Sequence, residues 1–110
     1  MGVLLDKQIK FAGLVSNLIA HAFSMGYGVT LGDAYRDPRC SYGSEVSLHK
    51  ERLAIDLNLF KREDGFWRFC PLTEDHRPLG EWWEAQDPEC AWGGRFKDGN
   101  HYSLQHGGRK

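Results

Sequence analysis

The stretch SLHKERLAIDLNLF, residues 47–60, constrains the fold of this chain most strongly. Its apolar residues fall at every second position, at Leu53, Ile55, Leu57 and Leu59. A period of two predicts a β-strand whose leucine face enters the core. Asp56 falls on the opposite face, in the middle of the strand, where an ionised carboxylate is costly unless it is paired or bound to a metal. The strand therefore carries a carboxylate that needs a partner.

A helix is predicted before this strand, from Asp6 to about Met25. Its apolar residues recur at spacings of three and four, at Phe11, Leu14, Val15, Leu18, Ala22 and Met25. This spacing is typical of an amphipathic helix, and Gly26 is a suitable residue to end it.

The other segments predict short strands and a second helix. Residues 27–31 alternate as a half-buried strand, and Glu63-Asp64-Gly65 predicts a hairpin turn before a return strand at 66–69. GEWWEAQ predicts a short helix, and a turn at 98–100 precedes a last strand. One helix followed by short strands with hairpin-length connections predicts an α+β fold, with a small antiparallel sheet and flanking helices.

Composition limits the classes of protein to which the chain can belong. Its 110 residues, 41% of them hydrophobic, suit one compact domain over residues 1–110. Lys and Arg total 14 against 15 Asp and Glu, so the chain lacks the positive excess of nucleic-acid-binding proteins. No secretory signal and no apolar run of 18 residues are present, so we expect no membrane insertion.

The three cysteines, Cys40, Cys70 and Cys90, have no CxxC spacing. Their odd number and their spacing argue against a disulfide framework and against a cysteine-rich zinc site. We expect reduced thiols, and we do not expect any of them to be a catalytic nucleophile.

A second polar motif, DGNHY, contains Asp98 and His101. The turn between these residues can bring both side chains to the same side. His49 precedes the Asp56 strand by a few residues and can fold back toward it. Two histidines and one aspartate match the three protein ligands of zinc sites that perform chemistry. Asp98 would then stand beside the metal as a base, whereas Arg36 is either a surface ion-pair residue or part of such a site.

Two motifs carry a resemblance to a known family. SLHKERLAID resembles the signature S-x-H-x-x-G-x-A-x-D, and WGGRFKDGNHY resembles W-G-G…D-x-x-H-[FY]. Both belong to the zinc D-alanyl-D-alanine carboxypeptidase and L-alanyl-D-glutamate endopeptidase family, which includes vancomycin-resistance D,D-dipeptidases and many phage endolysins. The first helix, the GYGVTLGDAYRDP segment and both motifs follow the family's order and together cover nearly the whole chain.

The resemblance implies a hedgehog/DD-peptidase-like fold and a role for each motif residue. Its implied Zn²⁺ ligands are His49, Asp56 and His101. It also implies that Asp98 is the general base and that Arg36 binds or polarises the substrate carbonyl. Ser47 is a candidate either to hold a ligand by a hydrogen bond or to cap the loop.

One position departs from the signature, because Arg52 stands where the family has glycine. A position that needs a positive φ would strain an arginine. We therefore expect a different path in the loop between His49 and Asp56; the alternative is that the charge of Arg52 faces the substrate.

The resemblance implies a peptidase acting on peptidoglycan stem peptides, and we expect a phage endolysin with L-alanyl-D-glutamate endopeptidase activity. The alternatives are a D-alanyl-D-alanine carboxypeptidase and, as in hedgehog signalling domains, a non-catalytic zinc-stabilised binding module. We expect a monomer without a wall-binding module. It would stay in the host bacterial cytoplasm and reach the cell wall after release through a separate membrane pore.

The remaining histidines have simpler interpretations. His21 is expected on the face of the first helix, and His76 is expected in a solvated, charged turn. His106 could compete as a ligand, but the motif favours His101. The tryptophans Trp82, Trp83 and Trp92 are expected in the core or in the wall of a cleft.

Overall fold

The computed structural model describes residues 2–34 and 48–110. The elements over these residues are α1 (Val3–Ser24), β1 (Tyr27–Leu31), the 3₁₀ turn η1 (Leu48–Glu51), β2 (Ala54–Glu63), β3 (Phe66–Phe69), α2 (Thr73–Gln86), β4 (Cys90–Trp92), the 3₁₀ turn η2 (Gly93–Phe96) and β5 (His101–Leu104). The predicted α+β class is confirmed.

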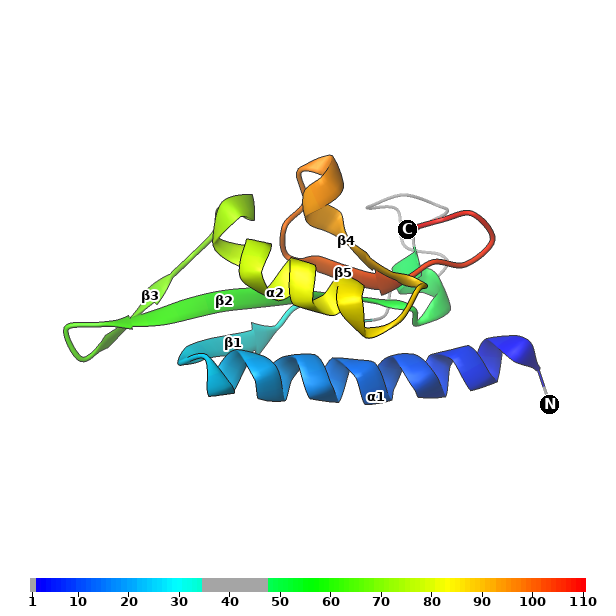
Figure 1. Cartoon of the computed structure of the whole chain (residues 1–110), viewed down its shortest axis with the longest axis horizontal. Coiled ribbons are helices and arrows are strands. Elements are labelled where there is room, and N and C mark those ends of the chain that lie inside the picture. Colours follow the sequence, from blue (N-terminus) through cyan, green and yellow to red (C-terminus); the bar gives the residue numbers. More distant parts are fainter. Residues whose placement is uncertain (1, 35–47) are drawn as a thin grey trace.

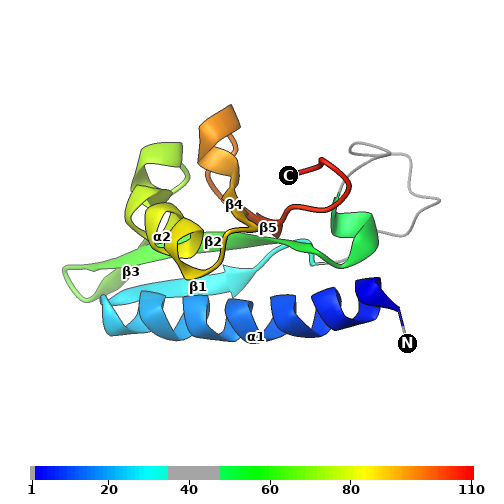
Figure 2. The ribbon, with the colours of Figure 1, turned by 45° about the vertical axis from the view of Figure 1, so that its right-hand side comes forward.

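The sheet is antiparallel and is organised around β2, which pairs with three other strands. The strand order is β1-β2-β5-β4, and β3 also pairs with β2. Residues 54–56 of β2 pair with β5, whereas its later residues pair with β1 and β3. In Figure 1, α1 runs lengthwise beneath β1 and β2, and Figure 2 shows α2 and β4 above β2. Residue 56 therefore lies in the first part of β2, which pairs with β5.

The predicted core is confirmed in both of its main elements except at Met25, which follows α1 and is exposed. The leucine face of β2 is buried, and α1 buries Phe11, Val15, Leu18 and Ala22 against it. Trp83 of α2 is fully buried and meets Phe11 edge to face, with ring centroids 6.0 Å apart. Burial of such side chains stabilises the fold by about 1.5–3 kcal/mol each.

The two chain reversals predicted from glycine also form. Gly26, with φ +87°, follows α1, and Asp64 and Gly65 have φ of 52° and 81° at the β2–β3 hairpin. Two consecutive left-handed residues match the twist of the adjoining strands.

The second helix is longer than predicted, because α2 begins at Thr73 and includes the EDHRP segment. The Asp75 carboxylate accepts a hydrogen bond from the Leu72 N–H at 3.2 Å, which caps the first turn. Pro78 is tolerated within the helix at the loss of one backbone hydrogen bond. As a consequence, His76 is buried, at 2% exposure, and its interpretation as a solvated turn residue was wrong.

Neither helix in the part of the chain that the structure describes is long and apolar enough to cross a membrane.

Candidate metal centre

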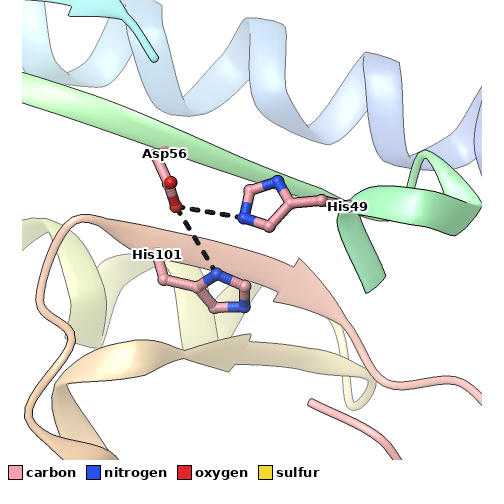
Figure 3. A group of neighbouring side chains, drawn as sticks. All are labelled: His49, Asp56 and His101. Carbon is pink, nitrogen blue, oxygen red and sulfur yellow. Dashed lines mark ion pairs between the residues drawn. The ribbon is translucent and has the colours of Figure 1, made fainter. Parts of the chain in front are cut away.

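His49, Asp56 and His101 converge from η1, β2 and β5 (Figure 3). Each offers one candidate ligand atom, and these atoms lie within 4.8 Å of one another. Nε2 of His49 is 3.2 Å from Oδ1 of Asp56, and Nδ1 of His101 is 3.5 Å from the same oxygen. The predicted ligand residues are therefore brought together, and the group could hold a metal ion.

Strand pairing places two of these side chains side by side. Asp56 and His101 are directly opposite each other in the register of β2 and β5. The backbone of Asp56 bonds on its other side, where its N–H donates to the Asp33 carbonyl at 2.9 Å and its carbonyl accepts from the Gly32 N–H at 2.8 Å. Asp56 and His101 thus form a non-hydrogen-bonded pair, the pair type in which facing side chains lie closer.

The turn η1, which carries His49, ends in a Schellman motif. The Leu53 N–H donates to the Leu48 carbonyl at 3.0 Å, and the Arg52 N–H donates to the His49 carbonyl at 3.3 Å. Both leucines are buried, which gives the motif its usual apolar contact. Gln8 of α1 adds a 2.9 Å hydrogen bond to the Glu51 carbonyl and so ties η1 to the first helix.

This motif explains the departure from the signature. In a Schellman motif the residue that follows the C-cap takes a left-handed conformation, and here that residue is Arg52, with φ 58°. The loop keeps the path that a glycine would allow, and Arg52 adopts the strained conformation at a cost of roughly 1–2 kcal/mol. The expected change of path is not required, because Arg52 itself takes the positive φ.

Asp98 lies on the turn between η2 and β5 and is exposed. Its N–H donates to the Gly93 carbonyl at 2.8 Å, and its carbonyl accepts from the His101 N–H at 3.1 Å. A Cβ at Gly93 would lie 2.2 Å from the Asp98 oxygen and 2.7 Å from the His101 Cβ. Only glycine therefore fits at this position of the WGG motif without displacing the turn.

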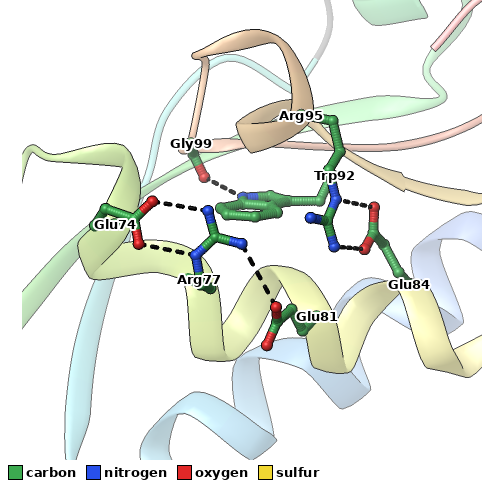
Figure 4. Close-up of polar contacts among 7 residues, drawn as sticks. All are labelled: Glu74, Arg77, Glu81, Glu84, Trp92, Arg95 and Gly99. Carbon is green, nitrogen blue, oxygen red and sulfur yellow. Dashed lines mark hydrogen bonds and ion pairs between the residues drawn. The ribbon is translucent and has the colours of Figure 1, made fainter.

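Trp92 packs against the same turn and hydrogen-bonds to it. It is fully buried, and its Nε1–H donates to the Gly99 carbonyl at 2.7 Å. The guanidinium groups of Arg77 and Arg95 lie over its ring, with Cζ 5.3 and 5.4 Å from the ring centroid (Figure 4). Glutamates of α2 hold both arginines, namely Glu74, Glu81 and Glu84. The motif residues 92–101 thus form one unit docked on α2.

The electrostatics of the group favour an ionised carboxylate. Burial raises the pKa of Asp56, but hydrogen bonds with His101 and His49 outweigh it and lower that pKa to about 2. Burial lowers the pKa of His101, but the hydrogen bonds with Asp56 and the Lys110 carbonyl, with a smaller contribution from the Asp98 charge, leave it above its usual value. A negative oxygen between two imidazoles is an arrangement that a cation can stabilise in place of a proton.

A main-chain oxygen outside the three-residue group determines which ring nitrogen of His101 carries a hydrogen. Its Nε2 is 2.9 Å from the Lys110 carbonyl oxygen, which also accepts a 2.8 Å hydrogen bond from the Ser103 hydroxyl. Because this oxygen only accepts, Nε2 carries a hydrogen, and Nδ1, which faces Asp56, is the nitrogen that a metal ion would take in place of a proton. Support of this kind orients metal-binding histidines. The sequence contains no signal for it, since the acceptor is a backbone atom.

Two predicted site residues, Arg36 and Ser47, lie outside the described residues, as does Cys40. His106 stands apart from the group, with its Nδ1 3.4 Å from the Lys7 ammonium. His21 stacks on Trp82 at 4.2 Å between centroids, as a helix-face residue can.

Cys70 and Cys90 are buried free thiols. Burial raises the pKa of Cys90 to about 12, so this thiol is a poor nucleophile.

Comparison of the chain with models of protein families gives no match, and comparison with curated proteins gives none.

Proposed function

We propose that this chain is a zinc-dependent peptidase that hydrolyses the stem peptides of bacterial peptidoglycan. The observation that carries the proposal is the convergence of His49, Asp56 and His101, with Asp98 on the turn that leads into β5 and its charge acting on His101. The resemblance of the two motifs to the carboxypeptidase and endopeptidase family supports the substrate class.

The donor set supports zinc as the metal. Two imidazole nitrogens and one carboxylate oxygen suit Zn²⁺, whereas Ca²⁺ and Mg²⁺ prefer oxygen ligands. Three protein ligands are also the number found in catalytic zinc sites, which keep a position for water or substrate.

A bound Zn²⁺ supplies Lewis-acid polarisation of a peptide carbonyl and makes water nucleophilic near neutral pH. Asp98 accepts the proton of the attacking water and delivers it to the amine of the departing residue. His101 keeps its orientation through the Lys110 carbonyl. Arg36 is proposed, by resemblance alone, to stabilise the negative charge that develops on the carbonyl oxygen.

Among the candidate activities we favour the L-alanyl-D-glutamate endopeptidase of a phage endolysin, because the motifs resemble those of such enzymes. A D-alanyl-D-alanine carboxypeptidase is the second candidate. A non-catalytic zinc-stabilised module would not need the exposed Asp98 carboxylate beside the ligands, which favours catalysis. An action at the cell wall after release from the host cytoplasm follows from the endolysin assignment.

Digestion of purified peptidoglycan, with fragments identified by mass spectrometry, tests this proposal. New amino termini at D-Glu support the endopeptidase, and loss of terminal D-Ala supports the carboxypeptidase. Each product should vanish with a chelator and return when Zn²⁺ is restored. The Asp98→Asn variant is the matched control for contaminating hydrolases. Absence of any chelator-sensitive product would contradict the proposal.

A further inference from the structure

The β2–β3 hairpin projects past the end of α1 and carries three exposed aromatic side chains (Figure 1). Phe66, Trp67 and Phe69 are 77%, 49% and 50% exposed. Trp67 lies opposite Arg62, and Phe69 lies opposite Phe60, in the register of the two strands. Because side chains alternate along a strand, Trp67 and Phe69 share the face of β2 that carries Asp56, whereas Phe66 lies on the other face.

Trp67 borders a pocket of about 350 Å³ at the edge strand β1. The pocket is lined by Phe23, Gly28, Val29, Thr30, Phe60 and Trp67, and we call it the Trp67 pocket. The indole of Trp67 spans β2 and reaches Gly28, where a Cβ would lie 3.1 Å from two ring carbons. The missing side chain of Gly28 therefore makes room for this ring.

The indole is also held from the hairpin. The Arg62 guanidinium lies over its ring, with Cζ 4.4 Å from the ring centroid, and Nη1 of the same arginine donates to the Gly65 carbonyl at 2.9 Å. A large aromatic ring that is already held in place loses little freedom when a ligand packs on it. Trp67 is thus half exposed and yet fixed, as a binding residue should be.

The Trp67 pocket continues the sheet face of the candidate metal centre. Asp56, Asn58 and Phe60 alternate along that face of β2. Nδ2 of Asn58 donates to the Thr30 hydroxyl at 3.2 Å, and both Thr30 and Phe60 line the pocket. Four residues of a strand span roughly 13 Å. A substrate held at Asp56 and extended along β2 therefore reaches the Trp67 pocket.

The lining of the Trp67 pocket suits a neutral ligand. None of the six described residues that line it has an ionisable side chain near neutral pH. The Thr30 hydroxyl accepts a hydrogen bond from Asn58, and its own hydrogen can be donated to a ligand. Apolar walls with a few polar groups are typical of small-ligand sites. A sugar ring, with its apolar face and its hydroxyl groups, matches this lining, whereas a stem peptide carries carboxylates.

We propose that the Trp67 pocket binds a sugar of the glycan strand to which the peptidoglycan stem is attached. This inference rests on the proposed function, because it takes a stem held at the metal centre as its starting point. In an L-alanyl-D-glutamate endopeptidase, only L-Ala and a lactyl group separate the cleaved bond from the nearest sugar, which is about 7 Å of chain. The glycan strand then begins within reach of the pocket.

An anionic membrane surface fits this hairpin less well. Such surfaces attract clusters of lysine and arginine. Here Arg68 pairs with Glu63, and Lys61 lies over the ring of Tyr27, with Nζ 5.4 Å from its centroid. The exposed Asp64 at the tip of the hairpin adds a negative charge. Glycan is therefore the occupant that the hairpin favours.

The first test compares two substrates built on one synthetic stem, whose L-Ala amine is either acetylated or joined to the muramyl disaccharide. We expect the zinc-loaded protein to prefer the disaccharide by about tenfold in kcat/KM, mainly through KM, the upper end of what one ring contact contributes. Trp67→Ala should reduce this preference to within about twofold, and Trp67→Phe should keep part of it. Gly28→Ala should also reduce it, because the added Cβ displaces the indole.

Phe66→Ala is the matched control, since it removes a more exposed aromatic ring from the other face of the hairpin. It should leave the preference unchanged. Equal cleavage of both substrates by the unaltered protein would overturn the assignment of the Trp67 pocket and leave the proposed function intact. An undiminished preference in Trp67→Ala would have the same meaning.

The second test needs no hydrolysis and so separates the two proposals. Metal-free protein in chelator is titrated calorimetrically with glycan strands from which the stems have been removed. We expect binding that Trp67→Ala weakens at least fivefold and that Phe66→Ala leaves unchanged. If neither stem substrate is cleaved, the proposed function fails, and this titration alone decides the pocket. Binding to phosphatidylglycerol vesicles through Trp67, without binding to glycan strands, would overturn the inference in favour of a membrane surface.

Discussion

The amide N–H of His101 donates a 3.1 Å hydrogen bond to the carbonyl oxygen of Asp98, so a candidate ligand and the candidate base share one turn. The bond uses backbone atoms only, and the Asp98 side chain is exposed. A side-chain substitution at Asp98 therefore leaves this connection in place. Metal binding and proton transfer should consequently be separable by mutation.

Asp98→Asn should keep the metal and lose most of the turnover, whereas His49→Ala should lose both. Loss of a positioned base costs about 10²–10⁴ in rate. Removal of one of three ligands weakens the binding of the metal itself. Metal content after dialysis and the rate of stem-peptide hydrolysis, measured on the same samples, check this prediction. Full activity in Asp98→Asn would remove Asp98 from the mechanism.

Gly93→Ala should displace the turn that carries Asp98, because its Cβ would lie 2.2 Å from the Asp98 carbonyl oxygen. We expect a loss of about 1–3 kcal/mol in the free energy of unfolding, together with weaker metal binding. Urea denaturation and metal titration measure the two effects. Gly13→Ala is the matched control, since a Cβ there meets nothing within 4 Å and lies inside α1. It should stabilise the protein by about 0.5–1 kcal/mol; a similar loss in both variants would count against the steric argument.

Arg52→Gly should raise the free energy of unfolding by about 1 kcal/mol. Arginine at φ 58° carries left-handed strain, which glycine avoids, although glycine also loses more backbone entropy on folding. Urea denaturation of the metal-free protein provides the measurement. A decrease in stability would show that the contacts of the Arg52 side chain outweigh its backbone strain.

Stability should fall as the pH drops from about 6.5 toward 4, because of His76. The folded pKa of His76, about 4, lies below its ordinary value of 6.5, so the unfolded state binds the proton more readily. The free energy of unfolding is therefore unaffected by His76 above pH 6.5. Between pH 6.5 and about 4 it decreases by roughly 1.4 kcal/mol for each pH unit. At pH 5 the loss amounts to about 2 kcal/mol.

The raised pKa of His101 makes the folded protein more stable at lower pH, which opposes the effect of His76. The unaltered protein is therefore compared with His76→Gln, both in chelator, so that the contribution of His101 is common to the two. The urea midpoint should fall less between pH 7 and pH 5 in His76→Gln than in the unaltered protein. An identical pH dependence in both proteins would contradict the assigned role of His76.

Much of the fold could be predicted because it depends on local patterns. The stripe of α1, the alternation of β2 and the Asp64-Gly65 turn each record in a few consecutive residues which face is buried or which φ is needed. The extent of α2 could not be predicted in this way. Its N-terminal half is polar and contains Pro78, and the burial of His76 depends on Tyr102, 26 residues further along the chain.

The sequence by itself determined which side chains are available as ligands, His49, Asp56 and His101, because motif spacing and residue chemistry are local properties. Only the tertiary structure decided how they meet. The strand register sets Asp56 opposite His101, and η1, which ends at a left-handed Arg52, places His49 against Asp56. The Lys110 carbonyl selects the nitrogen of His101 that faces Asp56. These relationships join backbone groups that are distant along the chain, and backbone groups are the same in every residue, so no pattern of side chains records them.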